Sequence, residues 1–300
     1  MSRFHPTRIL VPTDFSPVAT RAVEHAVELA RRFSAELMLL YADTFLPPID
    51  YIEIPSAAYV DGIPQLKKAT EKKLAAYLAE HVPPGIPAEA RVEVDSAIHA
   101  IVTIAASRPC ELIVMGTHGR TGWRRALLGS VTENVLREVD CGILTVRDGE
   151  IPVAAYRRIL CPVNYTAISM RSLEHAAAFA EAFGSELVIV NVVEEGAREE
   201  QANAIDRLRA WVPAEISAKL EYTELVLRGH PAEEVIQFAE RMEAGLIVVG
   251  AQHRRFSDTT VIGTTTERIT RHASCPVLTV ASRIPSATAQ PGAELARGKA

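Results

Sequence analysis

The stretch over residues 115–133 combines the glycine spacing and the flexibility that a phosphate-binding loop needs. Its pattern is Gly116-x2-Gly119-x9-Gly129-Ser130. A short apolar run precedes it at residues 112–114, and a helix-like pattern follows it. Glycines allow the backbone to approach a ligand closely, and the free N–H groups at the start of a helix attract anions. The stretch therefore predicts a phosphate-binding loop between a buried strand and a helix.

The same stretch is also compatible with an ordinary connection between a strand and a helix. Ser130 could begin a capping box with the glutamate three residues later, which would satisfy helix N–H groups without any ligand. Arg120, Arg124 and Arg125 favour the binding interpretation, because phosphates need positive charge. His118 could contact a phosphate or remain in solvent, and the sequence leaves both interpretations open.

Composition narrows the class of protein. The chain has 300 residues, of which 48% are hydrophobic, and a formal net charge of −5. This length suggests about two domains, and the charge argues against a nucleic-acid partner. No apolar run is long enough to span a membrane, and the opening run is too short for a signal peptide. Scattered cysteines without ligand-like spacing predict buried thiols in a reducing cytoplasm and no metal site.

The chain carries the same domain twice. The segment at Arg8 recurs at Arg158, an offset of 158 − 8 = 150, and the segment at Leu112 recurs at Leu246, an offset of 246 − 112 = 134. The first copy therefore holds 150 − 134 = 16 additional residues in its middle. The predicted units are a first domain over residues 1–150, a second over 151–282 and a disordered tail over 283–300.

Each copy alternates strands with helices. In the first copy, residues 9–11 form a strand ended by Pro12, and Ser16 caps the helix that follows. Such alternation predicts a parallel sheet with helices on both faces. Ligands of these sheets bind beyond the carboxyl ends of the strands, where the strand order reverses. Asp14 and Gly116 both fall at such ends.

Residues 44–64, around the additional segment, hold prolines and two tyrosines without a regular period. They predict a mobile, irregular segment that lies over or beside the predicted binding site of the first half as a lid, or else a surface loop that only packs on a neighbour. A helix over residues 67–81 is expected to follow.

Three side chains outside the loop invite a chemical interpretation. Asp14 could accept hydrogen bonds from ribose hydroxyls or an adenine amine, or it could cap the next helix. His25 and His175 occupy matching positions on equivalent helices. We expect these histidines to be structural and not catalytic.

The triplet Pro12-Thr13-Asp14, together with the glycine pattern and its continuation Val131-Thr132-Glu133-Asn134, resembles the ATP-binding branch of the universal stress proteins. The resemblance covers nearly the whole chain. It implies an α/β fold with two tandem flavodoxin-like or Rossmann-like domains. Each would be a five-stranded parallel sheet flanked by helices, and the two would pack as a pseudo-two-fold pair through their last strands.

The resemblance also implies ATP as the ligand, with Mg²⁺ as an optional companion of the nucleotide. The residues expected to bind it are Pro12, Thr13, Asp14, Ala42, Met115, Gly116, His118, Gly119, Arg120, Gly129, Ser130, Val131 and Thr132. The second copy departs from the pattern, with Asn164 in place of Asp14 and His253 in place of Gly119. We therefore expect one nucleotide, bound in the first domain.

The function implied by the resemblance is that of a cytoplasmic, nucleotide-dependent sensor or adaptor in a stress response. Its partners would be ATP, unidentified proteins and a second copy of the chain, with no nucleic acid and no membrane. The alternatives are a nucleotide-free scaffold and a slow ATPase. The sequence contains none of the motifs Ser-Gly-Gly-x-Asp-Ser, His-x-Gly-His and GxxxxGK[ST], so a dedicated ATP-using enzyme is not favoured.

Overall fold

The computed structural model describes residues 4–44, 57–108, 110–117, 128–147, 156–194, 196, 201–251, 253–256 and 259–281. The first half contains the strands β1 (Arg8–Pro12), β2 (Glu36–Ala42), β3 (Ala88–Glu93), β4 (Leu112–Gly116) and β5 (Gly142–Val146). Its helices are α1 (Pro17–Phe33), α2 (Ala57–His81), α3 (Ala97–Ser107) and α4 (Ser130–Glu138). Strands and helices alternate, as the hydrophobic pattern predicts.

The second half repeats this order after residue 156. Its strands are β6 (Arg158–Val163), β7 (Glu186–Val193), β8 (Tyr222–Arg228), β9 (Leu246–Ala251), β10 (His253–Phe256), β11 (Thr259–Ile262) and β12 (Val277–Ala281). Its helices are α5 (Ala167–Phe183), α6 (Gln201–Trp211), the short α7 (Ala214–Ser217), α8 (Pro231–Arg241) and α9 (Thr264–His272). The hairpin β10–β11 lies between β9 and α9.

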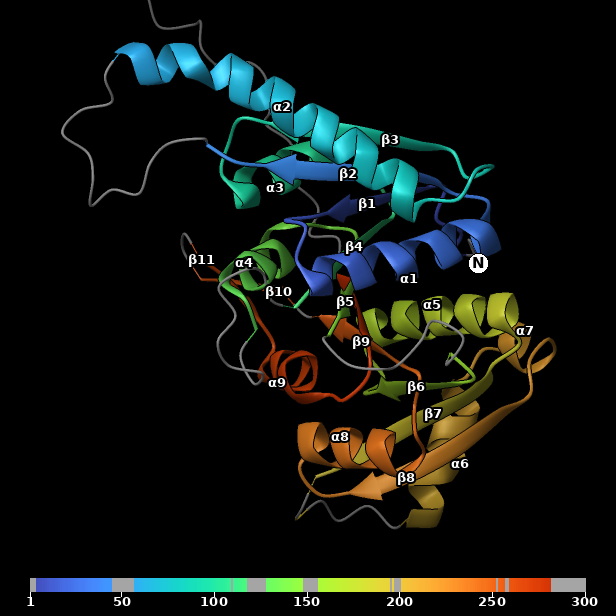
Figure 1. Ribbon diagram of the computed structural model, residues 1–300. Helices are drawn as coiled ribbons and strands as arrows, with labels where there is room; N and C mark the ends of the chain where they lie inside the picture. Colours follow the sequence, from blue (N-terminus) through green and yellow to red (C-terminus); the bar gives the residue numbers. More distant parts are fainter. Residues whose placement is uncertain are drawn as a thin grey trace, which may run out of the picture.

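The two halves share one ten-stranded sheet, in the order β3-β2-β1-β4-β5-β12-β9-β6-β7-β8 (Figure 1). Neighbouring strands run parallel within each half, and β5 meets β12 antiparallel, with Val277 opposite Thr145 and Thr279 opposite Ile143. The order reads the same from either edge to the centre. This symmetry confirms the predicted tandem α/β fold, in which the last strands of the two halves pair.

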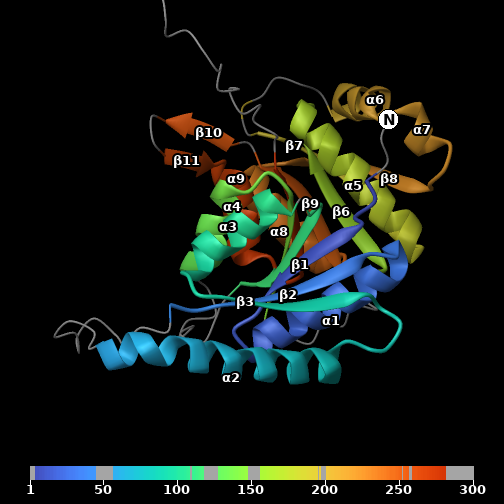
Figure 2. The ribbon, with the colours of Figure 1, turned by 90° about the horizontal axis from the view of Figure 1, so that it is seen from above.

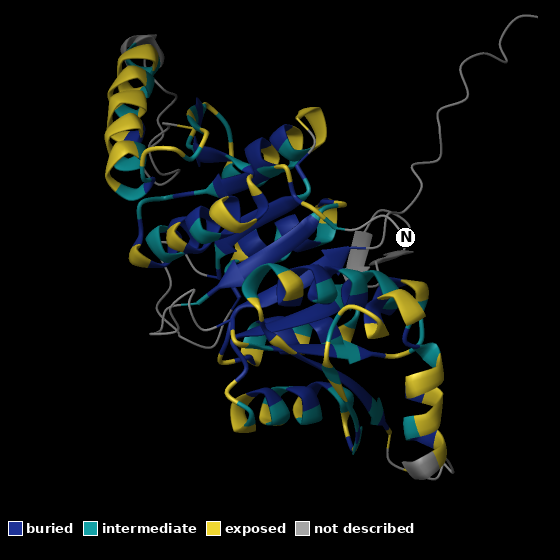
Figure 3. Ribbon diagram, turned by 90° about the vertical axis from the view of Figure 1, so that its right-hand side faces the viewer, coloured by how far each residue is buried: buried dark blue, intermediate teal, exposed yellow. Residues whose placement is uncertain are grey.

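Helices cover both faces of the sheet. On one face, α1, α2, α5 and α6 contribute to a single apolar cluster that runs across both halves. On the other face, α3 and α4 enclose one cluster and α8 and α9 enclose another. Figure 2 shows α1 and α2 on one side of β1 to β3, with α3 and α4 on the other. Figure 3 shows the buried strands between helices whose outer faces are exposed.

Helix α2 is longer than its sequence predicts. It begins at Ala57, well before residue 67, and it contains Pro64. Proline removes a helix hydrogen bond and usually ends a helix, which is why the sequence suggests an irregular segment here. Residues 57–64 of that segment are helical, so the irregular prediction is wrong for them. Residues 45–56 and the predicted tail over 283–300 lie outside the described residues.

An aromatic cluster joins the two halves between α1 and α5. Phe179 of α5 is fully buried, and its ring centroid lies 5.4 Å from that of Phe33 in α1 and 6.5 Å from that of Tyr156. Tyr156 also hydrogen-bonds Nδ1 of His25 in α1, at 2.6 Å. The segment that enters the second half thus packs on the first half. Burial of the aromatic rings makes this seam part of the common core.

The matching histidine of the second half is held in the same seam. His175 stacks on Phe4, with ring centroids 3.8 Å apart, and its Nδ1 donates to the backbone carbonyl of Arg171 at 2.7 Å. Burial lowers the pKa of both His25 and His175 to about 4, and positive charge on Arg21 and Arg171 adds to the effect. Both histidines are therefore neutral parts of the core, away from the glycine-rich loop.

These buried histidines predict a loss of stability in mild acid. The unfolded chain binds their protons near pH 6.5, whereas the folded chain binds them only near pH 4. Unfolding therefore takes up protons between these values, and stability falls as the pH is lowered from 6.5 to 4. Each histidine should contribute roughly 3 kcal/mol to this loss. Urea unfolding of wild type and His25→Gln across this range should show a shallower pH dependence in the variant. Equal slopes would contradict the assignment to His25.

Candidate functional site

A cavity of about 330 Å³ opens at the carboxyl ends of β1, β2 and β4, in the first half. This is the point where the strand order reverses, because β1 lies between β2 and β4. All the predicted site residues except His118, Gly119 and Arg120 line it: Pro12, Thr13, Asp14, Ala42, Met115, Gly116, Gly129, Ser130, Val131 and Thr132. His118, Gly119 and Arg120 lie outside the described residues. Residues more than a hundred positions apart in the sequence therefore line the same cavity.

The turn after β1 positions Asp14. The backbone N–H of Thr13 donates to the carbonyl of Leu40 at 2.9 Å, which anchors this turn on β2. The Asp14 carboxylate accepts from the backbone N–H of Ser16 at 3.0 Å, and Ser16 in turn caps α1. Asp14 therefore supports the start of α1 through Ser16, and it also lines the cavity.

Phe15, the next residue, has a backbone φ of 62°, which is unusual for a side chain of this size. Its ring stacks on Tyr41, with centroids 5.1 Å apart, and meets the edge of Tyr77 at 5.2 Å. The Lys73 ammonium lies 4.1 Å from the ring centroid, a cation–π contact. Packing on three sides holds the strained residue, which in turn fixes the direction of Asp14.

Helix α4 begins at the glycine-rich loop without a side-chain cap. Its N-cap is Gly129, and none of the described side chains makes a capping hydrogen bond there. The capping box expected from Ser130 and Glu133 is not formed, because Glu133 pairs with Arg137 one turn later. Ser130 instead lines the cavity. The first N–H groups of α4 therefore face a space that could hold an anion.

A second contact fixes the start of α4 relative to β4. The buried Thr132 hydroxyl donates to the carbonyl of Gly116 at 2.9 Å, and the N–H of Gly129 donates to the carbonyl of Thr117 at 2.7 Å. These bonds bring the two ends of the loop together. The strand end and the helix start consequently form one rigid wall of the cavity.

Several residues that line the cavity are missing from the sequence prediction: Ala19, Leu40, Tyr41, Asp43, Ala97 and Ile101. Asp43 is the most informative, because it follows β2 as Asp14 follows β1. It accepts from the Tyr41 hydroxyl at 3.1 Å. The position of an aspartate after a strand could have identified Asp43, whereas the apolar residues gave no signal beyond that of an ordinary core.

The cavity is electrostatically uneven. Asp14 and Asp43 place carboxylates at the ends of β1 and β2, whereas the amino-terminal end of α4 contributes Gly129 and Ser130 to another part of the lining. Polar, uncharged ligand groups are favoured near the carboxylates and anions near the helix. Among the residues that the structure describes, no group of three or more His, Cys, Asp or Glu side chains is placed to hold a metal ion.

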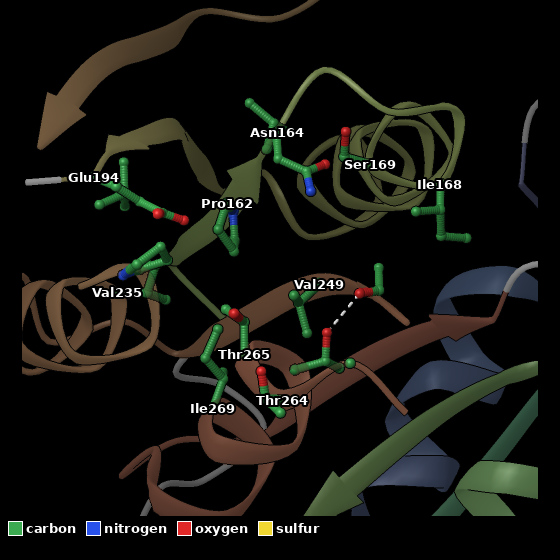
Figure 4. Close-up of a pocket in the computed structure, with 16 residues that line it drawn as sticks. Pro162, Asn164, Ile168, Ser169, Glu194, Val235, Val249, Thr264, Thr265 and Ile269 are labelled. Carbon is green, nitrogen blue, oxygen red and sulfur yellow. Dashed lines mark hydrogen bonds between the residues drawn. The ribbon is translucent and has the colours of Figure 1, made fainter. Parts of the chain in front are cut away.

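The second half contains a matching cavity of about 470 Å³. Figure 4 shows Asn164 and Glu194 on one side of it and Thr264 and Thr265 on the other. The Thr266 hydroxyl donates to the carbonyl of Gly250 at 2.7 Å, as Thr132 does to Gly116. The cavity wall is therefore retained even though the sequence pattern is altered.

The chain beyond β9 differs from a simple glycine loop. Residues from His253 to Ile262 form the antiparallel hairpin β10–β11, in which His253 lies opposite Ile262. Some of the backbone N–H groups in this hairpin form hydrogen bonds between its two strands. Asn164 accepts from the Thr166 hydroxyl at 2.7 Å and carries no charge. The uncharged Asn164 in place of Asp14 distinguishes the lining of the second cavity from that of the first.

Comparison with known proteins agrees with the fold and the repeat. The sequence pattern of the Universal stress protein family matches residues 6–147 and again residues 155–281. The chain therefore belongs to the universal stress protein family, as a tandem member.

Individual relatives show the same relationship. A universal stress protein of Methanocaldococcus jannaschii is 34% identical over 143 residues, which span 47% of this chain and 81% of that protein. A universal stress protein structure from Archaeoglobus fulgidus covers 93% of this chain and 99% of its own, with a TM-score of 0.70 and 22% identity. Another from Archaeoglobus fulgidus, solved in complex with dAMP, covers 42% of this chain and 98% of its own, with 23% identity and a TM-score of 0.35.

Helices of membrane-spanning length and composition are absent from the part of the chain that the structure describes. None of the helices there is both long enough and apolar enough to cross a bilayer.

Proposed function

We propose that this protein binds ATP in the first-half cavity and acts as a nucleotide-dependent sensor or adaptor in a cytoplasmic stress response. The observation that carries the proposal is the convergence of the predicted residues. Asp14 after β1, Gly116 after β4 and Ser130 at the start of α4 all line one cavity. A wall with carboxylates at one side and an uncapped helix start at the other suits a nucleoside joined to phosphates.

The orientation of the nucleotide follows from the charges. The nucleoside belongs near Asp14 and Asp43, whose oxygens can accept hydrogen bonds from ribose hydroxyls or the adenine amine. The phosphates belong near Ser130, because the helix start favours negative charge and the carboxylates repel it. Ala42 and Val131 supply apolar surface between these polar ends. Mg²⁺ enters the proposal only as an ion carried by the phosphates.

Binding without rapid turnover fits the described lining residues best. Asp14 already accepts a hydrogen bond from Ser16 and Asp43 accepts one from Tyr41. Both are placed for the nucleoside and not for activating water at a terminal phosphate. We propose that conformational change on binding, transmitted to protein partners, is the output, and that hydrolysis is slow. A phosphate-release assay should give turnover far below the 1–10³ s⁻¹ typical of enzymes.

The direct test is native mass spectrometry of the full chain purified without added nucleotide. The proposal expects a bound mass matching ATP, or its recovery when ATP is added, at one nucleotide per chain. Titration calorimetry with ATP, ADP and GTP would then establish the preference for adenine and for the third phosphate. Absence of binding to any of these nucleotides would support the scaffold alternative.

Substituting Asp14→Asn should weaken ATP binding about tenfold, equivalent to about 1.4 kcal/mol. The amide oxygen can still accept from the N–H of Ser16, so the turn should survive, but a charge-assisted hydrogen bond to the nucleoside is lost. Titration calorimetry measures the change, with circular dichroism as the check on folding. The matched control is Asn164→Asp in the second half, which should leave first-half affinity unchanged. Equal affinity of Asp14→Asn and wild type would remove Asp14 from the proposed site.

A further inference from the structure

Two cysteines of the first half lie at the starts of adjacent strands. β4 and β5 are parallel neighbours, with Leu112 opposite Gly142 (Figure 1). Where this strand pairing begins, the backbone N–H of Gly142 donates a hydrogen bond to the carbonyl of Glu111 at 3.2 Å. Cys110 precedes Glu111 and Cys141 precedes Gly142, so the two cysteines flank one inter-strand hydrogen bond. Extending the strand register by one residue places Cys141 opposite Glu111, the neighbour of Cys110. A strand spacing of about 4.8 Å and a rise of about 3.3 Å per residue then give a Cα separation of roughly 6 Å for the two cysteines, which a disulfide can span.

Both side chains also point into the same apolar cluster. Cys110 is 7% exposed and Cys141 is half-buried, and both pack with the cluster formed by α3, α4 and the adjoining strands. The two thiols are hydrogen-bonding partners, which lowers the pKa of Cys110 and raises that of Cys141 well above its usual range. The structure records both as free thiols. One thiol of the pair is thus the better nucleophile and the other lies beside it.

The remaining cysteines provide an internal comparison. Burial raises the pKa of Cys161 well above its usual range and that of Cys275 to about 12. Cys275 is the counterpart of Cys141, at 275 − 141 = 134, whereas the counterpart of Cys110 is Ala244, at 244 − 110 = 134. The second half therefore keeps the fold at this place with one thiol and an alanine. The pairing of thiols is a feature of the first half and is not required by the strand arrangement.

We propose that Cys110 and Cys141 form a reversible disulfide when the protein meets a peroxide. The thiolate of Cys110 attacks one peroxide oxygen, the O–O bond breaks, and Cys110 becomes a sulfenic acid as hydroxide leaves and takes up a proton. The Cys141 sulfur then attacks the Cys110 sulfur, the S–O bond breaks and water leaves. In total two thiols are oxidised to a disulfide and one peroxide is reduced to two waters when hydrogen peroxide is the oxidant.

The position of this pair gives the disulfide a structural consequence. It would close a loop that starts before β4, passes through the glycine-rich loop and α4, and ends before β5. The end of β4 and the start of α4, which the hydrogen bond between Thr132 and Gly116 joins, both lie within this loop. Cross-linking removes conformational freedom mainly from the unfolded chain. Oxidation should therefore stabilise the unit that carries the loop, independently of whether a nucleotide binds.

The test is peptide mapping of the full chain after treatment with hydrogen peroxide, under non-reducing conditions. The expected product joins the peptides containing Cys110 and Cys141, lacks two hydrogen atoms relative to the reduced pair, and reverts with dithiothreitol. The thermal midpoint should rise by roughly 5 °C on oxidation and return on reduction.

Two variants make the test specific. Cys110→Ala copies Ala244 of the second half and should fold, yet lose both the cross-link and the thermal shift. Cys161→Ala should retain both. The proposal is overturned if Cys110 and Cys141 stay reduced under conditions that oxidise the half-buried Met170 and Met242. It is equally overturned if they accumulate as separate sulfinic or sulfonic acids, or if the cross-link persists in Cys110→Ala.

Discussion

Replacing Phe179 by alanine is expected to cost about 3–5 kcal/mol of unfolding free energy. Phe179 is fully buried between α1 and α5, where its ring meets those of Phe33, Tyr156 and Phe4. Its removal leaves a cavity in a seam to which both halves contribute, so neither half can collapse around it alone. Such a loss is a large part of the 5–15 kcal/mol that typically separates folded and unfolded proteins. Urea unfolding followed by circular dichroism measures it.

Phe183→Ala is the matched control. Phe183 lies one turn further along α5 and is only half-buried, with the Arg32 guanidinium 5.2 Å from its ring centroid. Its truncation should cost about 1 kcal/mol, because the space it leaves is open to water. If both substitutions cost the same, the seam between α1 and α5 would not be the cooperative junction of the two halves.

The substitution Ala42→Trp should weaken ATP binding at least a hundredfold, equivalent to about 2.7 kcal/mol. Ala42 ends β2 and is half-buried, and it lines the first cavity. An indole ring there would occupy the space between the carboxylates and the start of α4, where we place the base. Because the new ring has an existing cavity to enter, the sheet should keep its stability. Titration calorimetry and urea unfolding together separate blocked binding from misfolding.

Val192→Trp is the corresponding change in the second half. Val192 occupies the position of Ala42 at an offset of 150 and lines the second cavity. Our proposal of one ATP per chain expects Val192→Trp to bind ATP as wild type does. If Val192→Trp instead lowers the stoichiometry, the second cavity binds nucleotide as well. ATP binding that survives in Ala42→Trp would place the nucleotide elsewhere.

The cysteines show that separation along the sequence does not predict separation in the folded protein. Cys110 and Cys141 are 141 − 110 = 31 residues apart, without any recognisable motif. From sequence they are two of four scattered thiols. Only the pairing of β4 with β5 brings them beside one another. The same is true of Asp14 and Asp43, which meet at one cavity because β1 and β2 are neighbours.

Features that depend on short-range patterns and on repetition could be predicted from the amino-acid sequence. Alternating strands and helices, the offset between Arg8 and Arg158, and the placement of Gly116 between a strand and a helix all follow from local hydrophobic periodicity and from chain duplication. The pairing of β5 with β12 was expected from the resemblance to the universal stress proteins, and the structure shows it.

Which polar groups pair with one another could be established only from the folded structure. Glu133 could cap α4 or pair with Arg137, and it pairs with Arg137. Pro64 lies inside a helix despite its propensity to end one, and His25 hydrogen-bonds a tyrosine of the other half. Local sequence offers each of these side chains several partners of similar energy. For His25 the partner depends on which distant segment the common sheet brings within hydrogen-bonding distance, and the pairing matters because an unpaired polar group is costly in the core.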